Sequence, residues 1–319
     1  MIIAPMTASS LVLGAPVAVR LADWGVIRAK GEDAASFLNG QLTQETLRLE
    51  PGHARLAGYC SPKGRLLASF VMWRGAADEI LLACSADLLA PTLKRLSMYV
   101  LRAKCKLSDA SSELALWGVA LPGLADLAIP AAPYTTAEVA GGTAVRLADA
   151  GGSVRLLWAA PAEAAPPWPA TTQEDVWNWL EVQSGVPRIV AKTVEAFVPQ
   201  MVNLELVGGV NFQKGCYPGQ EIVARSPYRG TVKRRMFLAE GDTAAAVGAE
   251  VFAQSDPSQP AGQIVLAASL AQHGGGARHA ALVEMKRALT EDGELRIGAA
   301  DGPALRLREL PYDIPVDAP

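Results

Sequence analysis

The C-terminal part of the chain, after Thr231, constrains the fold more than any other stretch. Short apolar runs alternate there with turns rich in glycine, and the runs are residues 236–239, 250–253, 263–268, 280–285, 294–297 and 304–307. Runs this short are typical of strands and too short for helices of ordinary length. A succession of them joined by tight turns predicts a small all-β barrel or sandwich.

Before Thr231 the pattern is mixed. Apolar runs predict strands at residues 21–29, 66–73, 79–84, 114–120 and 154–158. Helical spacing of apolar residues predicts helices at residues 34–38 and 85–100, and a third that begins near residue 172 and stops at Gly185. The stretch 161–172, rich in proline and alanine, is the best linker candidate. This part of the chain is therefore predicted to be α+β.

Composition narrows the function classes. The net charge is −3 over 319 residues, which argues against wholesale binding to nucleic acid or anionic membranes. The cysteines Cys60, Cys84, Cys105 and Cys216 lie far apart, so neither a disulfide framework nor a self-contained zinc or iron–sulfur site is expected. No stretch is long and apolar enough to span a bilayer, and the uncharged residues 1–19 lack the basic start of a signal peptide. We expect a cytoplasmic protein.

Residues 211–221 are the best candidate for a reactive site. Cys216 stands between Gly215 and Gly219, with Lys214 before it, and Gln220 and Glu221 close the stretch. The glycines permit positive φ or close backbone approach, which predicts a presented loop. Nearby cations favour the thiolate, the form that attacks electrophiles and ligates metals. The alternative is that Cys216 is a small buried hydrophobe, the common fate of a free cysteine.

Two further features are candidates for ligand binding. Trp24 and Trp177 offer flat rings on which a pterin could stack, although core packing is the alternative for each. Helical spacing gives Trp177 and Leu180 one face and Trp179 another, so at least one of these tryptophans is expected to have another role or to lie at an interface. The basic run is suited to a carboxylate tail or an RNA phosphate, or is a solvated surface; it consists of Arg225, Arg229, Lys233, Arg234 and Arg235.

The stretch Lys214-Gly215-Cys216-Tyr217-Pro218-Gly219-Gln220-Glu221 resembles the motif of the YgfZ family. That family comprises folate-binding proteins linked to iron–sulfur cluster assembly or repair, and it is related to the glycine-cleavage T-protein. Other stretches resemble the family as well: residues 21–24, 37–43, 59–65, 197–204 and 310–312. The resemblance covers nearly the whole chain.

The resemblance implies a multi-domain, T-protein-like α+β fold around a central opening. Residues 1–52 and 112–230 would form a discontinuous folate-binding domain. Residues 53–111 would form a small α+β domain, and residues 231–319 the C-terminal β-barrel.

The resemblance also assigns site residues. Trp24 and Trp177 match the tryptophans of the family's folate site, and Gln183 falls where the T-protein has a glutamate that reads the pterin. Cys216 matches the family's critical cysteine, and the remaining motif positions are Lys214, Gly215, Tyr217, Gly219, Gln220 and Glu221. We add Arg225 and Arg229 as candidate folate contacts. Ala68 and Ser69 stand where the T-protein carries its catalytic aspartate, which removes that acid–base group.

We therefore expect a protein that binds tetrahydrofolate or a derivative and assists iron–sulfur cluster assembly or repair in client proteins. In the family these clients include tRNA-thiolating enzymes. Cys216 alone supplies one ligand, so any cluster would be shared or transient. Two alternatives stay open: a folate-dependent aminomethyl transferase with Cys216 as nucleophile, and a tRNA-binding module that uses the basic patch at residues 225–235. An accessory role is favoured over that of a conventional enzyme.

Overall fold

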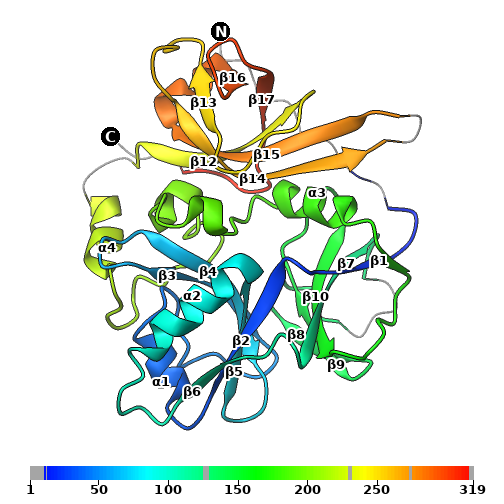
Figure 1. Cartoon of the computed structure of the whole chain (residues 1–319), viewed down its shortest axis with the longest axis vertical. Helices are drawn as coiled ribbons and strands as arrows, with labels where there is room; N and C mark the ends of the chain where they lie inside the picture. Colours follow the sequence, from blue (N-terminus) through cyan, green and yellow to red (C-terminus); the bar gives the residue numbers. More distant parts are fainter. Residues whose placement is uncertain (1–10, 12, 125–128, 229–231, 273–274, 316–319) are drawn as a thin grey trace.

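The computed structural model describes residues 11, 13–124, 129–228, 232–272 and 275–315, without the side chains of residues 225–228. Three β-sheets account for the architecture, and one of them is a closed barrel. The barrel lies over the other two sheets, which stand side by side beneath it (Figure 1). Within the described residues, no helix has both the length and the apolar character needed to cross a membrane.

The barrel confirms the prediction made from the short apolar runs. Its strands close in the order β12 (Arg234–Gly241), β15 (Ala277–Lys286), β14 (Gly262–Ala271), β13 (Glu250–Ala253), β16 (Glu294–Ile297) and β17 (Ala304–Arg308). A short helix, η3 (Arg287–Asp292), joins β15 to β16. Apolar side chains such as Val251, Ile264 and Leu305 fill the interior. Closure pairs every strand on both sides, which removes exposed edges.

The second sheet has five strands in the order β3-β4-β5-β2-β6. They are β3 (Ala54–Cys60), β4 (Leu66–Arg74), β5 (Glu79–Ser85), β2 (Trp24–Lys30) and β6 (Lys106–Asp109). Helices α1 (Ala34–Asn39) and α2 (Ala86–Ser97) bury their apolar residues against it. Pro91 lies inside α2, in its second turn, where its missing N–H removes one hydrogen bond of the helix.

The third sheet has six strands in the order β11-β1-β7-β10-β9-β8. They are β11 (Ala170–Thr171), β1 (Val17–Arg20), β7 (Leu114–Leu121), β10 (Val154–Pro161), β9 (Gly142–Arg146) and β8 (Thr136–Val139). The predicted linker thus contributes the short strand β11, which pairs parallel to β1.

Helix α3 (Asp175–Gln183) lies between the six-stranded sheet and the barrel. Trp177 packs on the sheet, whereas Trp179 belongs to the core shared with the barrel. Arg278 of β15 covers the Trp179 ring at 4.5 Å from its centroid. The expectation that one tryptophan of this helix sits at an interface is confirmed.

The sheets divide the chain differently from the predicted domain boundary at residues 52 and 53. Strand β2 pairs antiparallel with β5, from Trp24 opposite Ser85 to Lys30 opposite Glu79. Strand β2 and helix α1 therefore belong with residues 54–109, and only β1 of the N-terminal segment joins the six-stranded sheet. The pairing of β2 with β5 places β2 in the five-stranded sheet. Apolar periodicity within β2 predicts a strand but does not indicate which other strand pairs with it.

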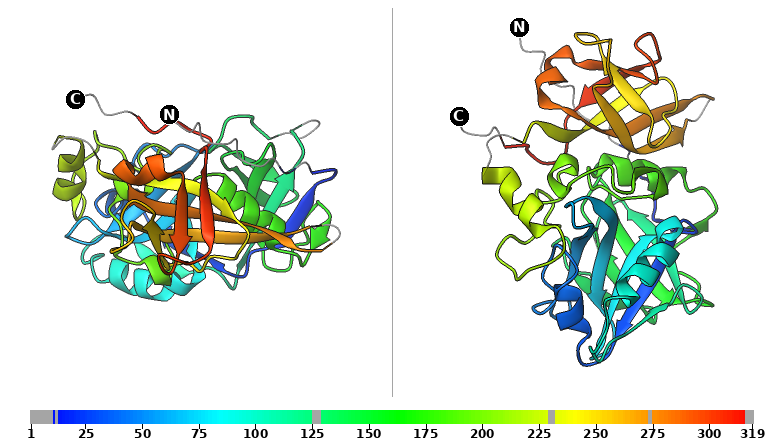
Figure 2. Two further views of the ribbon diagram at one scale, coloured as in Figure 1. Left: turned by 90° about the horizontal axis from the view of Figure 1, so that it is seen from above. Right: turned by 60° about the vertical axis from the view of Figure 1, so that its left-hand side comes forward.

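The segment after α3 connects all three sheets. It contains η1 (Ala191–Thr193), η2 (Pro199–Val202) and α4 (Gln220–Tyr228), and α4 lies on the outside of the molecule (Figure 2). The end of the chain returns to this segment. The Tyr312 hydroxyl donates to the Gly185 carbonyl at 2.7 Å and lies 3.3 Å from the side-chain nitrogen of Asn203.

Candidate functional site

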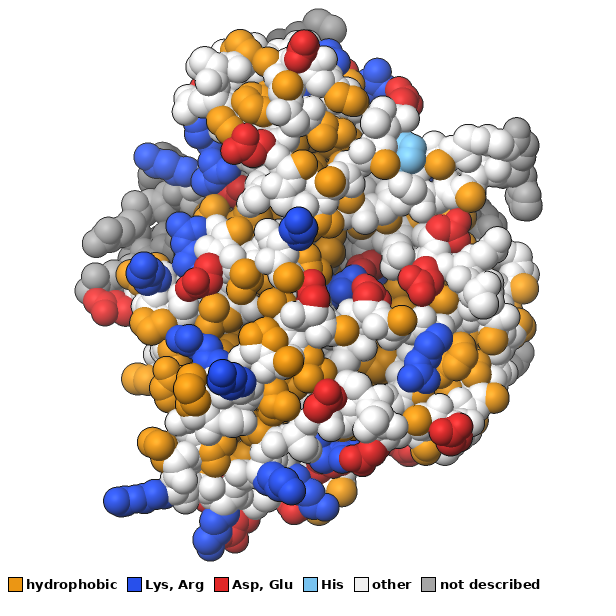
Figure 3. Space-filling view, viewed as in Figure 1, with side chains coloured by type: hydrophobic (Ala, Val, Ile, Leu, Met, Phe, Trp, Pro, Cys, Tyr) orange, Lys and Arg blue, Asp and Glu red, His pale blue; other side chains and the backbone are white. Residues whose placement is uncertain are grey.

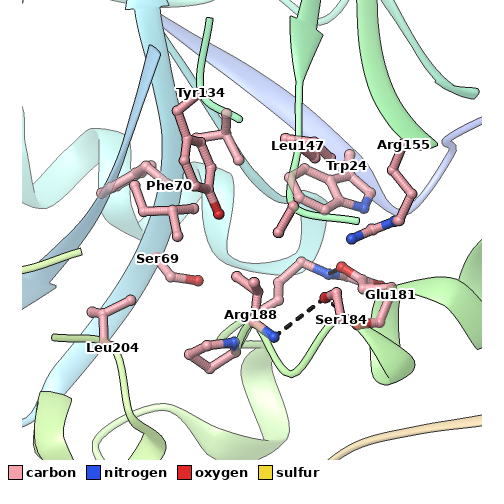
Figure 4. Close-up of a pocket in the computed structure, with 15 residues that line it drawn as sticks. Trp24, Ser69, Phe70, Tyr134, Leu147, Arg155, Glu181, Ser184, Arg188 and Leu204 are labelled. Carbon is pink, nitrogen blue, oxygen red and sulfur yellow. Dashed lines mark hydrogen bonds and ion pairs between the residues drawn. The ribbon is translucent and has the colours of Figure 1, made fainter. Parts of the chain in front are cut away.

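A pocket lies where the two open sheets meet the loop that follows α3 (Figure 4). It holds about 490 Å³ of space free of protein atoms, part of it open to solvent. Strand β2 contributes Trp24, β4 contributes Ser69, and β10 contributes Arg155. The remaining polar lining comes from Tyr134, Glu181, Ser184 and Arg188. Five stretches that are far apart in sequence thus contribute polar groups to one site.

Arg188 organises one wall of the pocket. Its Nε and Nη2 donate to the two oxygens of Glu181 at 2.8 and 2.9 Å, and Nη2 also donates to Asp23 at 2.8 Å. Its guanidinium lies 4.9 Å from the centroid of the Trp24 ring. Burial alone would lower the pKa of Arg188, but the charges and hydrogen bonds of Glu181 and Asp23 outweigh burial and raise it. Arg188 therefore stays charged and remains bound to Glu181 and Asp23.

Arg155 is the other cation of the pocket, and it is bound differently. Its side chain is 3% exposed, its Nε has no hydrogen-bond partner, and its guanidinium stacks on Trp177 at 4.6 Å. Burial lowers the pKa of Arg155 to about 10, with Glu181 acting in the opposite sense. In the part of the chain that the structure describes, its guanidinium forms no ion pair or hydrogen bond. Figure 4 shows it reaching from β10 toward the pocket beside Trp24 and Glu181.

Trp177 supports Arg155 from behind. It is 2% exposed and lies against β7, where a Cβ on Gly118 would come within 2.3 Å of its ring. Only glycine permits this close approach. Trp177 was predicted to stack directly on a ligand, but the structure does not bring it to the pocket lining, because Arg155 covers it.

The backbone and hydroxyl groups of the pocket are also specialised. Tyr134 has φ +60°, a conformation that costs a residue with a side chain of order 1–3 kcal/mol. The Ser69 hydroxyl accepts a hydrogen bond from the Ile189 N–H at 2.9 Å. Ala68, its neighbour in β4, is fully buried in the core on the other face of the sheet. The pocket therefore presents a hydroxyl, and no carboxylate, at these two positions.

Gln183 lies away from the pocket. It is 2% exposed, and its amide donates to Glu240 of the barrel at 3.2 Å. The pocket receives its carboxylate from Glu181, two residues earlier in α3, and sequence reasoning did not identify this residue. Sequence reasoning also did not identify Arg188, the ion-pair partner of Glu181, because no sequence motif links the two residues.

The loop of Cys216 forms a separate feature on the outer surface. Cys216 is an exposed free thiol, and no residue of the loop 211–221 lines the pocket. Beneath it, the Lys214 ammonium donates to the carbonyls of Asn39, Leu42 and Gly215 at 2.5, 3.0 and 3.2 Å. Burial lowers the pKa of Lys214 to about 8, against opposing effects of Glu45 and Cys216. Lys214 thus anchors the loop to the segment that follows α1.

The rest of the motif seats the loop on the turn at residues 61–65. Gly219 has φ +79°, and a Cβ there would lie 2.4 Å from the Ser61 carbonyl oxygen, so both expected uses of glycine apply to it. Gly215 shows neither positive φ nor a close neighbour. Tyr217 is buried, with Lys214 at 4.7 Å from its ring centroid. Gln220 and Glu221 begin α4.

The basic run is partly committed to internal ion pairs. Arg234 pairs with Glu284 within the barrel, and Arg235 pairs with Glu205. Arg225 lies in α4 with an undescribed side chain, and Arg229 lies outside the described residues. Two of the five cations proposed for a basic patch are therefore already neutralised.

A second, outer cavity shares Glu181 and Arg188 with the pocket, and it holds about 840 Å³ of space free of protein atoms, part of it open to solvent. Its other polar lining residues are Asp23, Asp87 and Asn178, and Leu266 of the barrel closes it. On the face shown in Figure 3, several acidic side chains and a basic one lie along the lower edge of a hollow near the middle of the molecule. The Arg188–Glu181 pair thus forms a partition between the inner pocket and the outer cavity.

The class of fold is clear from a comparison with solved structures. The crystal structure of glycine cleavage system aminomethyltransferase T from Bartonella henselae is similar to this structure with a TM-score of 0.70. The match covers 95% of this chain and 87% of that one, at 16% sequence identity. The chain therefore has the aminomethyltransferase T fold, as predicted.

Sequence comparison is more specific. A protein from Edwardsiella ictaluri (strain 93-146) called "tRNA-modifying protein YgfZ" is 33% identical over 249 residues, which are 70% of this chain and 70% of that protein. One of the same name from Vibrio atlanticus (strain LGP32) is 25% identical and covers 92% of this chain and 91% of its own length. No model in a scan of protein families matches. The chain belongs to the YgfZ family of tRNA-modifying proteins.

Proposed function

We propose that this protein binds tetrahydrofolate or a derivative in the pocket and assists iron–sulfur cluster assembly or repair in client proteins. One observation carries the folate part. The pocket combines the Trp24 ring, the Glu181 carboxylate and the unpaired guanidinium of Arg155. An aromatic surface with one acceptor and one donor group suits a flat heterocycle with polar edges. The related fold of an aminomethyltransferase agrees with this ligand class.

The residues of the pocket would hold the folate as follows. Trp24 would contact the pterin ring, Glu181 would accept from its N–H groups, and Arg155 would donate to an oxygen. The apolar lining, including Phe70, Val71 and Leu147, would exclude water. A reduced folate, when bound, would carry a one-carbon unit. Ser69 and Ala68 provide no carboxylate for acid–base catalysis, so the proposal is an accessory protein and not an aminomethyl transferase.

The second part concerns Cys216. Its exposed thiol stands on a loop fixed by Lys214 and by the contact of Gly219 with Ser61. Such a thiol can offer one ligand to a cluster held mainly by a client, or accept a persulfide sulfur. The clients would include enzymes that thiolate tRNA, in keeping with the relatives' name. The free thiols of Cys60, Cys84 and Cys105 fit a reducing compartment, and we place the protein in the cytoplasm.

Binding is tested by titrating tetrahydrofolate anaerobically against intrinsic tryptophan fluorescence. We expect saturable quenching in the wild type that weakens in Trp24→Phe. Trp168→Phe is the matched control, because Trp168 packs on Trp158 away from the pocket. Absence of binding by both fluorescence and calorimetry would reject the folate proposal.

The role of the thiol is tested separately. Cys216→Ala should keep folate affinity and lose the ability to support cluster-dependent tRNA thiolation in cells. Cys105→Ala, which removes a half-buried thiol on a different surface, should keep both. Full tRNA thiolation in Cys216→Ala would remove this cysteine from the function. Direct tRNA binding that falls steeply with salt and ignores folate would instead favour a tRNA-binding module.

A further inference from the structure

We infer that Arg155 is a specificity-determining residue that reads the oxygen at position 4 of the pterin, so that the pocket accepts 4-oxo pterins and discriminates against 4-amino pterins. The inference rests on the proposed folate function. It concerns which edge of the ligand faces β10, and it assigns a role to a residue that no sequence motif singled out.

The Arg155 guanidinium is buried and has no ionic partner among the described residues. A buried cation without a partner is costly, and buried arginines are ordinarily paired. Arg188 and Arg146 illustrate this, because Arg188 is shared between Glu181 and Asp23, and Arg146 pairs with Asp149. Among the described residues, the Arg155 guanidinium contacts the face of Trp177 and has no ion-pair partner. Its N–H groups are thus available to an acceptor that enters the pocket.

The fold keeps Arg155 in this position. Trp177 fixes the guanidinium plane, and Gly118 makes room for Trp177 against β7. Strand β10 is paired on both sides, with β7 and with β9. Arg155 therefore cannot easily turn away to find solvent. A donor held rigidly in a low-dielectric site discriminates strongly between ligands that offer an acceptor and ligands that do not.

Arg155 and Glu181 line the same pocket, and the Glu181 carboxylate is the largest favourable charge acting on Arg155. They present a donor beside an acceptor. The 4-oxo group and the adjacent N3–H of a pterin present an acceptor beside a donor, which is the complementary pattern. A 4-amino group would place N–H donors against a guanidinium that has only donors.

An anionic ligand tail is the other chemistry that could meet Arg155. The surroundings favour the ring edge, because Arg155 is 3% exposed and faces the pocket shared with Trp24. The outer cavity, where a tail would emerge past Arg188, carries the carboxylates of Asp23 and Asp87, which disfavour further negative charge. The experiment below distinguishes a contact of Arg155 with the ligand tail from a contact with the ring edge.

The test uses the full chain and two matched ligand pairs. Tetrahydrofolate and tetrahydroaminopterin differ at position 4 alone, and tetrahydropteroate lacks the glutamate tail. Affinities are measured by calorimetry for the wild type, Arg155→Met and Arg20→Met. Arg20 is the matched control, since it is an arginine near a tryptophan of the same sheet, 5.9 Å from the Trp117 ring, and does not line the pocket.

We expect the wild type and Arg20→Met to bind the 4-oxo ligand about 10- to 100-fold more tightly than the 4-amino ligand, as for a hydrogen bond to a charged group. In Arg155→Met the ratio should fall toward one through loss of 4-oxo affinity. A wild-type ratio near one, or an unchanged ratio in Arg155→Met, would overturn the inference and leave the folate proposal standing.

The other outcomes are equally decisive. If removal of the glutamate tail, and not the change at position 4, abolishes the effect of Arg155→Met, the guanidinium reads the tail and the inference fails. If no ligand binds the wild type, the folate proposal itself fails. Should Arg155→Met not fold, Arg155→Lys, which keeps the positive charge but loses the planar guanidinium, should show an intermediate ratio, and an unchanged ratio in Arg155→Lys would overturn the inference.

Discussion

Removal of Arg188 should destabilise the protein by about 3–5 kcal/mol. In Arg188→Met the Glu181 carboxylate, whose side chain is 8% exposed, would lose both hydrogen bonds from the guanidinium. Breaking a buried ion pair from one side leaves an uncompensated charge, which sets this magnitude. The contact with Asp23, 49% exposed, adds less than about 1 kcal/mol because solvent screens it.

A double-mutant cycle isolates the pair. Glu181→Leu with Arg188→Met removes both charges, so the double variant should be much less destabilised than the sum of the two single variants. The coupling energy expected for such neighbours is about 1–3 kcal/mol. Lys104→Met, which breaks a pair with Glu32 exposed on both sides, is the control and should cost less than about 1 kcal/mol.

Denaturant unfolding gives these energies if the transition is two-state, and a protein built of three sheets needs a local measurement as well. Hydrogen exchange of amides in α3 and in residues 184–190 supplies it. We expect faster exchange there in Arg188→Met and unchanged exchange in the barrel strand β13. A cost below 1 kcal/mol with additive single variants would refute the view that this pair is the central support of the pocket wall.

Three further outcomes follow from individual contacts. Gly118→Ala should cost about 1–3 kcal/mol and alter the near-ultraviolet circular dichroism of Trp177, because its Cβ would meet the ring at 2.3 Å; Gly123→Ala, with open space around it, should do neither. Gly219→Ala should speed alkylation of Cys216 by a bulky reagent, since the new Cβ collides with the Ser61 carbonyl and the backbone has φ +79°; an unchanged rate would contradict the seating of the loop. The stability of the wild type relative to Lys214→Met should rise by up to about 3 kcal/mol between pH 8 and 10.5, as measured by urea unfolding. The sign follows because the pKa of Lys214 is lowered from 10.5 to about 8 in the folded state, so the cost of burying the ammonium applies fully below pH 8 and vanishes as pH rises; a flat difference would show that the ammonium is not desolvated.

Local features of this fold were predictable from sequence, and pairings between distant segments were not. The barrel followed from six short apolar runs, and strand β4 and helix α3 followed from their periodicity. Strand β2 belongs to the five-stranded sheet because it pairs with β5, and the sequence of one strand does not indicate which strand it pairs with. The glycines around Cys216 predicted a presented loop, and the Cys216 thiol is exposed.

In the pocket, too, contacts between side chains that are distant in sequence were not predictable. Trp24 could be proposed from its chemistry, and it lines the pocket. The role of Trp177 as a support for Arg155 depends on a contact across β10 and α3, and the ion pair of Arg188 with Asp23 joins residues 165 positions apart. A buried arginine in an apolar strand, such as Arg155 in residues 154–158, was the one available signal, because such residues rarely sit inside without a partner.

The position of β1 has a consequence for synthesis of the chain. This strand lies between β7 and β11, whose residues follow it by about a hundred and a hundred and fifty positions. On a ribosome that adds 5–20 residues per second, β1 would wait on the order of 10 s for its second neighbour. Residues 24–109, which complete the five-stranded sheet, would meanwhile fold as a unit. A nascent chain whose residues up to 110 have left the ribosomal exit tunnel should therefore display one finished sheet and one unpaired apolar strand, which is the kind of segment that chaperones bind.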